Sequence, residues 1–352
     1  MALILLLSSC AGLLSSCAGD PQTSDARSML PSKVGASGEV VVVADAATWA
    51  AVQPVIEQAL QGPVSVLPQF EPQFDIEHLT PSELSRFWKP HRNLVIFDVA
   101  DRIDTQEPSM LIGKEKYSRG QIYARIKATT PDAAAEIFSS RAAELADLLE
   151  RTEVKRFLQL TNLRSNEALE KQLLHAHGLR SVIPRDAVLV EETPEFLWIQ
   201  RSLTRLKGNN NHDVQMGIFI TRAPYTGPEM FSLAGMLARR DSVLRERVGG
   251  EVPGSFMATE YRRTPRYEEI AFHGGFAATL RGLWKMEGDF MGGPFTAIAW
   301  LDPFTNELVT VDGFAYAPYF SKREYLREIE GIAHSFLPVD RGEIGIDIID
   351  KQ

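Results

Sequence analysis

The chain has 352 residues, of which 44% are hydrophobic, and it carries a net charge of −9 with a pI near 5.4. This length suits two domains, or one large one, and buries enough surface to fold without disulfides or a structural metal. The acidity argues against nucleic acid as a partner and against a protein body that lies flat on anionic lipid. Both nucleic acid and anionic lipid are negatively charged and bind patches of Lys and Arg. Both cysteines, Cys10 and Cys17, lie near the N-terminus, so the rest of the chain has no thiol chemistry.

An apolar run over residues 2–14 predicts the hydrophobic part of an export signal, because it is too short for a membrane-spanning helix of roughly 20 residues. The step Leu14-Ser15-Ser16-Cys17 resembles the bacterial lipobox, which implies a signal peptide over 1–17 and lipidation, such as palmitate, at Cys17. Two or more acyl chains would anchor the protein stably to a membrane of the bacterial cell envelope. Residues 18–38 then predict a flexible tether.

Two alternatives to this leader stay open. Leu7-Ser8-Ser9-Cys10 matches the lipobox equally, although its apolar run of about six residues is short for a signal. The first residues contain no Lys or Arg, which leaves open a true start upstream of Met1. An apolar N-terminus of a cytosolic protein is the remaining reading.

Residues 39–180 predict a first α/β half. Two Thr-Pro steps mark helix starts, since proline is favoured at the first helical position. The expected elements are a strand 40–43, a helix 47–60, an edge strand or loop 64–76, a short helix 80–88, strands 93–99 and 121–128, and a helix 130–160.

Residues 181–339 predict a second half with the same order of elements, followed by a C-terminal extension over 340–352. After two strands within 183–199, the expected elements are a strand 217–221, a helix 229–248, an extended piece 256–272, a short helix ending at Trp284, strands 295–301 and 307–315, and a helix 322–336. We therefore predict an α+β fold of two similar α/β halves, with mixed sheets and packed helices. The hypothesis is an internal β-α-β-α-β-β-α duplication with a groove between the halves, and coincidence is its alternative.

The segment Leu283–Phe295, LWKMEGDFMGGPF, resembles an uncharacterised lipoprotein family known as domain of unknown function 4837. The resemblance extends to Leu67–Pro72 with Phe74, to Arg92-Asn93 and to Asp312–Pro318, and so spans nearly the whole mature chain. It implies an envelope lipoprotein without an assigned activity. The C-terminal extension lies outside it.

This family-like segment, together with the arginine two residues before it, predicts a binding site for a small anionic or peptide ligand. Its paired glycines let a ligand approach the backbone closely, and an arginine and a tryptophan on adjacent helical turns could bind a carboxylate or phosphate and stack on it. The alternative is a tight turn with the tryptophan in the core. The candidate residues are Arg281, Trp284, Asp289, Met291, Gly292 and Gly293.

No catalytic residues, metal ligands or cofactors are predicted. The chain has no Gly-x-Ser-x-Gly elbow and no strand–GxGxxG–helix or Walker pattern. Glu71, Asp75, Asp289, His212 and His273 could act as acids or bases only if the fold brings them together. The pair Arg239-Arg240, with Asp241 and nearby charges, predicts a salt-bridged helix surface.

These observations favour a non-enzymatic envelope lipoprotein that binds another envelope component or an exported ligand in the groove between its halves. A hydrolase or transferase acting on envelope material is the alternative, with acids that converge only in the fold. A structural lipoprotein without a ligand is a third reading.

Overall fold

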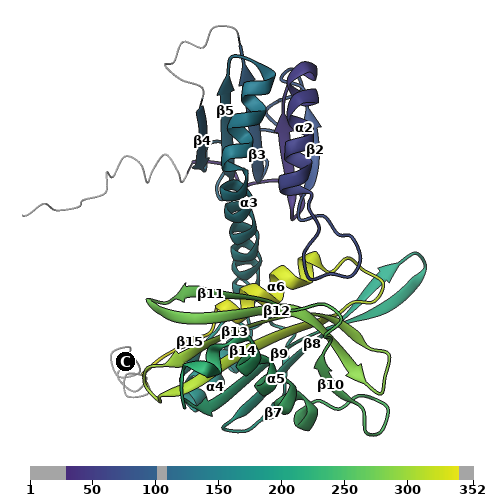
Figure 1. Ribbon diagram of the computed structural model, residues 1–352, viewed down its shortest axis with the longest axis vertical. Coiled ribbons are helices and arrows are strands. Elements are labelled where there is room, and N and C mark those ends of the chain that lie inside the picture. Colours follow the sequence, from purple (N-terminus) through teal and green to yellow (C-terminus); the bar gives the residue numbers. More distant parts are fainter. Residues whose placement is uncertain (1–28, 101–108, 341–352) are drawn as a thin grey trace, which may run out of the picture.

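The computed structural model describes residues 29–100 and 109–340. Within these residues the chain forms two units, each built on its own large sheet and joined by a long helix (Figure 1). The predicted signal peptide, Cys17 and the first part of the predicted tether lie outside the described residues, as does the C-terminal extension beyond residue 340. In the described part no helix is both long and apolar enough to cross a membrane.

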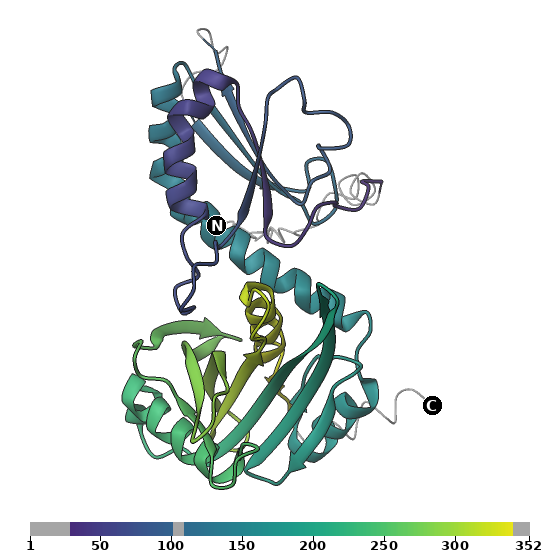
Figure 2. The same cartoon turned by 90° about the vertical axis from the view of Figure 1, so that its right-hand side faces the viewer.

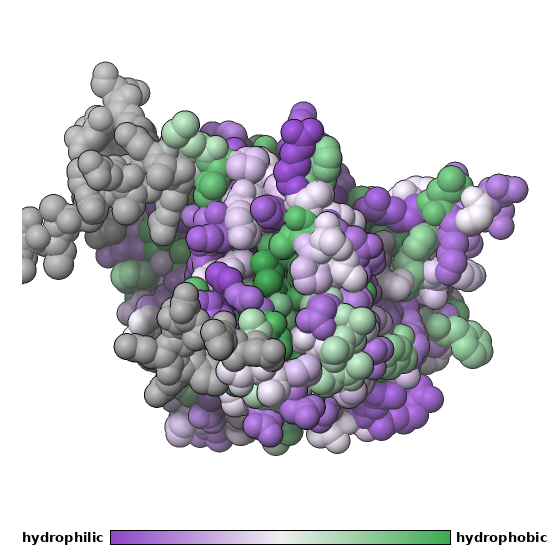
Figure 3. All heavy atoms as spheres, turned by 90° about the horizontal axis from the view of Figure 1, so that it is seen from above, coloured by the Kyte–Doolittle hydropathy of each residue, from purple (hydrophilic) through white to green (hydrophobic). Residues whose placement is uncertain are grey.

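The first unit is a five-stranded sheet in the order β2-β1-β3-β5-β4, in which only β4 is antiparallel to its neighbour. The strands are β1 (Glu39–Val43), β2 (Asp75–Leu79), β3 (Asn93–Val99), β4 (Ser109–Lys114) and β5 (Ile122–Ala128). Helices α2 (Ala46–Leu60) and α3 (Pro131–Asn162) cover one face of this sheet (Figure 2). Seen from its free end, this unit shows a narrow hydrophobic strip bordered by hydrophilic residues (Figure 3).

Helix α3 begins at a Thr-Pro step, as predicted, with the Thr130 hydroxyl accepting the N–H of Ala133 at 3.2 Å. Its 32 residues make it roughly 48 Å long. A seven-residue strand such as β3 spans only roughly 23 Å. The C-terminal part of α3 therefore extends beyond the first sheet and packs against α6 of the second unit (Figure 1).

A buried ionic cluster ties β3 to α3. The carboxylate of Glu153 is fully buried, lies 2.5 Å from Nη1 of Arg156 and 3.2 Å from Nη1 of Arg92, and accepts Nδ2 of Asn93 at 2.9 Å. Burial by itself would raise the pKa of Glu153, but Arg156 and Arg92 outweigh it and hold the pKa below its ordinary value. The family-like step Arg92-Asn93 therefore serves the packing of the first unit.

The second unit is an eight-stranded antiparallel sheet with the path β10-β12-β13-β14-β9-β8-β7, in which β11 also pairs with β12. Its strands are β7 (Val188–Glu192), β8 (Phe196–Lys207), β9 (Asn210–Pro224), β10 (Phe256–Thr259), β11 (Arg266–Phe272), β12 (Gly275–Glu287), β13 (Gly292–Asp302) and β14 (Glu307–Tyr316).

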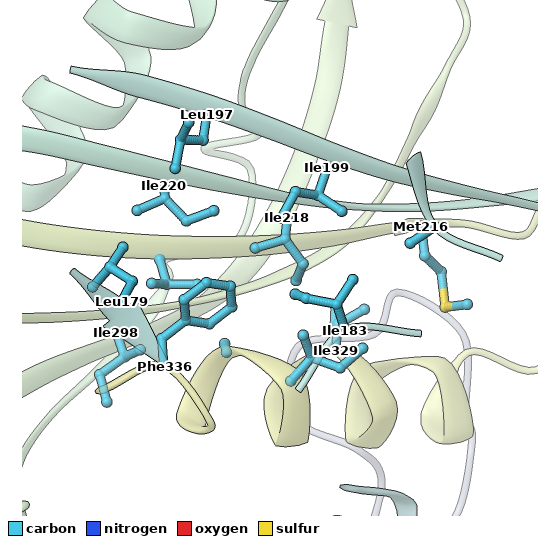
Figure 4. Packing of buried hydrophobic residues seen from close by; sticks show 14 of the residues in the cluster. Leu179, Ile183, Leu197, Ile199, Met216, Ile218, Ile220, Ile298, Ile329 and Phe336 are labelled. Atoms are coloured by element: carbon cyan, nitrogen blue, oxygen red, sulfur yellow. The ribbon is translucent and has the colours of Figure 1, made fainter. Parts of the chain in front are cut away.

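Helices cover both faces of this second sheet. On one face α6 (Arg323–His334) packs in a cluster that includes Ile218, Ile329 and Phe336 (Figure 4). The same cluster takes in α4 (Glu167–His177) and β6 (Leu179–Arg180), which pairs with β15 (Leu337–Pro338). On the other face lie α5 (Leu233–Arg247) and the short 3-10 helix η1 (Pro228–Phe231).

The α+β class is confirmed, but the predicted internal duplication is wrong. The first sheet is mostly parallel and the second is antiparallel throughout. The two units therefore have different sheet topologies, although their elements were expected in a similar order. Residues 275–287, where a helix was expected up to Trp284, form strand β12, and residues 80–88 make turns. Helix α4 falls within residues 39–180, the predicted first half, but it packs in the core of the second unit.

Residues 67–75 of the first unit, which we call the clasp, hold the N-terminal end of α6. Glu71 is buried, and its Oε2 accepts the backbone N–H groups of Lys322 at 2.7 Å and Arg323 at 3.0 Å. The guanidinium of Arg323 in turn pairs with Asp75 at 2.7 Å. A second family-like segment is therefore a contact between the two units.

Candidate functional site

The structure places Arg281 and Trp284 on opposite faces of the second sheet, so they do not form one site. Both lie on β12, where successive side chains alternate between faces. Arg281 pairs with Glu330 of α6. Trp284 is 2% exposed on the α5 side, where its indole N–H donates to the carbonyl of Ala315 at 3.3 Å. The two side chains were expected on adjacent turns of a helix, but residues 275–287 form a strand, so the two side chains are not adjacent.

The glycine pair allows neighbouring strands to approach closely. Gly292 and Gly293 begin β13, and a Cβ added to Gly293 would lie 2.0 Å from the carbonyl oxygen of Ala315. Asp289 lies in the preceding turn, where its carboxylate accepts the next backbone N–H at 2.6 Å. Met291 is partly buried against the α5 cluster. This geometry supports the tight-turn interpretation of the segment.

The candidate acids and bases do not converge on one site. Glu71 and Asp75 both lie in the clasp, where they contact Arg323, and Asp289 is in the turn between β12 and β13. The ring of His212 lies 4.1 Å from that of Tyr319, and His273 lies in the turn between β11 and β12. None of these candidates lines the pocket beneath α5 described below, or the apolar pocket that Ile183, Ile199 and Ile329 line on the α6 side. Among the described residues, no group of three His, Cys, Asp or Glu could hold a metal ion.

A small pocket lies between α5 and the second sheet. Strands β9, β12, β13 and β14 form its floor and α5 its wall. It encloses ≈ 20 Å³, room for about one water molecule. It continues into an open region, ≈ 370 Å³ in all with the solvent at its mouth. Apolar side chains make up most of the lining, and the polar lining residues are Thr221, Arg239, Arg240, Thr310 and Asp312.

Arg240 and Asp312 form a buried ion pair in this pocket. Nε of Arg240 donates to Oδ2 of Asp312 at 2.5 Å, Nη1 donates to Thr259 at 2.9 Å, and the guanidinium carbon lies 3.7 Å from the ring centroid of Phe295. Burial raises the pKa of the Asp312 carboxyl despite the arginine beside it. Nη2 of Arg240 and Oδ1 of Asp312 are buried without a hydrogen-bond partner in the described chain. An unpaired buried polar group costs about 1–3 kcal/mol, so the pair offers one donor and one acceptor to a ligand.

Arg239 adds a positive charge to the same pocket. Its guanidinium donates only to neutral oxygens, the Thr310 hydroxyl at 3.2 Å and the Met230 carbonyl at 3.4 Å, and the residues that the structure describes give it no carboxylate partner. Burial lowers the pKa of Arg239. The charged residues of the lining are thus two arginines and one aspartate, and a second aspartate beside the lining, Asp241, lies 3.9 Å from Nη1 of Arg240.

These pocket residues were missed at the level of sequence. Arg239 and Arg240 were expected on a salt-bridged helix surface, but Arg240 is 7% exposed and packs into the sheet. The usable signal was Asp312, a carboxylate within the otherwise largely apolar strand 307–316. A charge in such a strand needs a buried partner of opposite sign, and α5 supplies it.

Fold and site together define a two-unit α+β protein with an arginine-lined pocket in its second unit. That unit matches the family model described as domain of unknown function (DUF4837) over residues 166–335, which confirms the resemblance seen in Leu283–Phe295. The first unit, including the clasp, matches a separate model, domain of unknown function (DUF8532), over residues 33–162. The expected extension of the resemblance to Leu67–Pro72 and Arg92-Asn93 is therefore wrong, because these segments lie outside the DUF4837 match. No curated protein is similar to the chain in sequence.

Two solved structures are slightly similar to the chain. The Ran-binding protein Mog1p of Saccharomyces cerevisiae is 10% identical, with a TM-score of 0.31, and the match covers 48% of this chain and 94% of that one. A mutant of protein Mog1 is 11% identical, with a TM-score of 0.30, and the match covers 47% and 94% of the two chains. Similarity at this level supports no conclusion about function.

Proposed function

We propose that this protein is a binding protein held at the bacterial cell envelope by lipid on Cys17, and that an envelope component or exported ligand enters the pocket beneath α5. The leader ending in Leu14-Ser15-Ser16-Cys17 supports the anchor. The observation that carries the binding role is the unpaired donor of Arg240 beside the unpaired acceptor of Asp312. A ligand that pairs both groups gains their hydrogen bonds and relieves the cost of leaving them unmade.

This proposal places the ligand in the pocket beneath α5 and not in the groove that was predicted between the halves. The boundary between the units carries the clasp and Arg327 of α6, which pairs with Glu150 of α3 at 2.5 Å and donates to the carbonyl of Gln73 at 2.7 Å. A hydrolase or transferase acting on envelope material would need acids that converge, whereas Glu71 and Asp289 lie at separate places.

The anchor is tested by exchanging each cysteine in turn and separating membrane from soluble fractions. Cys17→Ala should release the protein from the membrane fraction, because the acylated residue is lost, while Cys10→Ala should leave it bound. Release by Cys10→Ala alone, or by neither change, would contradict lipidation at Cys17.

Ligand binding is tested by the thermal shift that an envelope extract produces. The extract should raise the melting temperature of the wild-type chain, because a ligand that binds only the folded state stabilises it. Ala297→Leu fills the pocket from β13 and should abolish the shift, whereas Ala238→Leu on the exposed side of α5 should keep it. Circular dichroism confirms that each variant is folded, and Thr310→Val serves as a second pocket variant. An equal shift in wild type and both pocket variants would refute the site.

A further inference from the structure

The last part of the predicted tether is fixed on the first unit. The backbone of Val34 is hydrogen-bonded to Pro90 at 3.1 Å and to Arg92 at 2.9 Å, and the carbonyl of Pro31 accepts the N–H of Arg119 at 2.9 Å. Figure 2 shows the purple segment before β1 on the side of the first unit away from α2 and α3. Three segments meet on this side, and we call them the tether surface: residues 29–34, 86–92 and 114–121.

The tether surface is basic, although the chain as a whole is acidic. Besides the buried Arg92, it carries six Lys and Arg side chains that are exposed or partly exposed. Glu115 is the acid within the three segments, and Glu39, which pairs with His91, and Glu83 lie close to them. Six bases therefore stand against three acids. The six bases are Lys33, Arg86, Lys89, Lys114, Lys116 and Arg119.

The charge of this surface, and not that of the whole chain, decides what can approach it. At physiological salt, exposed charges act over about 8 Å, so acids elsewhere on the two units are screened. Clusters of about four to eight Lys and Arg close to a membrane bind anionic phospholipid headgroups. The six bases of the tether surface fall within that number.

Aromatic rings beside these cations favour a membrane over a dissolved acidic polymer. Phe87 is 71% exposed, and the guanidinium carbon of Arg86 lies 5.0 Å from its ring centroid. Nζ of Lys89 lies 5.9 Å from the ring centroid of Tyr117. In the headgroup layer of a bilayer an exposed ring meets acyl chains while the neighbouring cation meets phosphate. A dissolved polymer would leave Phe87 in water.

We infer that the tether surface lies against anionic phospholipid headgroups and so orients the first unit on the membrane. This inference rests on the proposed anchor, which brings the surface within reach: Met29 is twelve residues after Cys17, a stretch that spans at most about 43 Å. Lipid on Cys17 limits the distance to the bilayer but does not choose which side of the protein faces it. Charge complementarity supplies that choice.

Co-sedimentation of the full-length Cys17→Ala chain with lipid vesicles tests this contact apart from the acyl chains. Vesicles of equal parts phosphatidylglycerol and phosphatidylcholine should bind it about tenfold or more tightly than vesicles of phosphatidylcholine alone, since each base at an anionic surface contributes about fivefold. The apolar run 2–14 meets both kinds of vesicle, so the difference between them reports charge. This difference should vanish at about 1 M salt, where charges act over only about 3 Å.

Charge reversal on the tether surface should remove the preference for anionic vesicles. The variant combines Lys89→Glu, Lys116→Glu and Arg119→Glu, and Lys89→Glu alone should weaken binding by about fivefold or more. Arg245→Glu, at an exposed arginine of α5 in the second unit, is the matched control and should keep the preference. Circular dichroism confirms that each variant is folded.

The outcomes separate this inference from the proposed anchor. Equal binding to the two kinds of vesicle, or a preference that survives the triple reversal, would overturn the contact. Binding to heparin without a preference for anionic vesicles would also overturn it and assign the surface to an acidic polymer. A salt wash of the membrane fraction removes the contact and leaves the anchor to be tested alone. If the washed wild type stays bound and Cys17→Ala is released, the anchor stands whatever the vesicles show.

Discussion

Glu71 joins the two units through a helix end, and replacing it measures what the clasp contributes. Its carboxylate accepts two N–H groups in the first turn of α6, where backbone donors lack helical partners and the helix dipole favours a negative charge. Losing such a cap costs about 0.5–2 kcal/mol. Losing the dipole interaction costs about 0.3–1 kcal/mol more. We therefore expect Glu71→Ala to lower the free energy of unfolding by about 1–3 kcal/mol.

Hydrogen exchange of the peptide covering residues 320–327, together with urea unfolding, provides the readout. The amides of Lys322 and Arg323 should exchange faster in Glu71→Ala, because their acceptor is gone. Asp75→Asn is the matched control: it removes the other carboxylate of the clasp, whose side chain is 58% exposed and pairs with Arg323. Exposed pairs contribute about 0–1 kcal/mol. Unchanged exchange in Glu71→Ala, or a loss of stability no larger than in Asp75→Asn, would refute the capping role.

Three further outcomes follow from buried contacts. Gly293→Ala should lower the melting temperature, with an overpacking cost of about 1–3 kcal/mol, because its Cβ would overlap the Ala315 carbonyl. Gly113→Ala, whose Cβ would meet nothing within 4 Å, should change stability by less than about 0.5 kcal/mol. Glu153→Gln should cost about 3–5 kcal/mol in urea unfolding, because it leaves two buried arginines without a counter-charge. The pKa of Glu153 is lower folded than unfolded, so its stabilisation is present above the ordinary carboxyl pKa and is lost as pH falls through the lowered value. Melting temperatures between about pH 7 and pH 3 should then fall less steeply in Glu153→Gln, and equal slopes would contradict this.

Elements with clear local signals in the sequence were predicted correctly. Strand β3 was expected at its observed bounds, and α3 was expected from its Thr-Pro start to within a few residues of its end. Strand β12 failed because a strand covered on both faces loses the alternation of apolar and polar residues that marks a strand. The difference between a parallel and an antiparallel sheet depends on pairings between distant residues. Two similar orders of elements therefore could not reveal two different topologies.

The same limit applies to the candidate site. Residues close in sequence were predicted to act together, but strand alternation sends Arg281 and Trp284 to opposite faces. The pair that does meet, Arg240 and Asp312, is separated by 72 positions. A buried aspartate in an apolar strand signals that a partner exists, but only the packing of α5 on the sheet identifies it.

Strand β14 connects the pocket and the clasp without placing them on one face. The side chain of Asp312 reaches Arg240 on the α5 side, whereas a Cβ on the next residue, Gly313, would lie 3.1 Å from Cβ of Ile329 in α6. Adjacent residues of one strand thus face the two helices that cover opposite sides of the sheet. A larger side chain at Gly313 would crowd Ile218 and Ile329, whereas Asp312 faces α5 on the opposite side. Two neighbouring positions of a family-like segment therefore serve separate purposes, one in pairing with α5 and one in packing against α6.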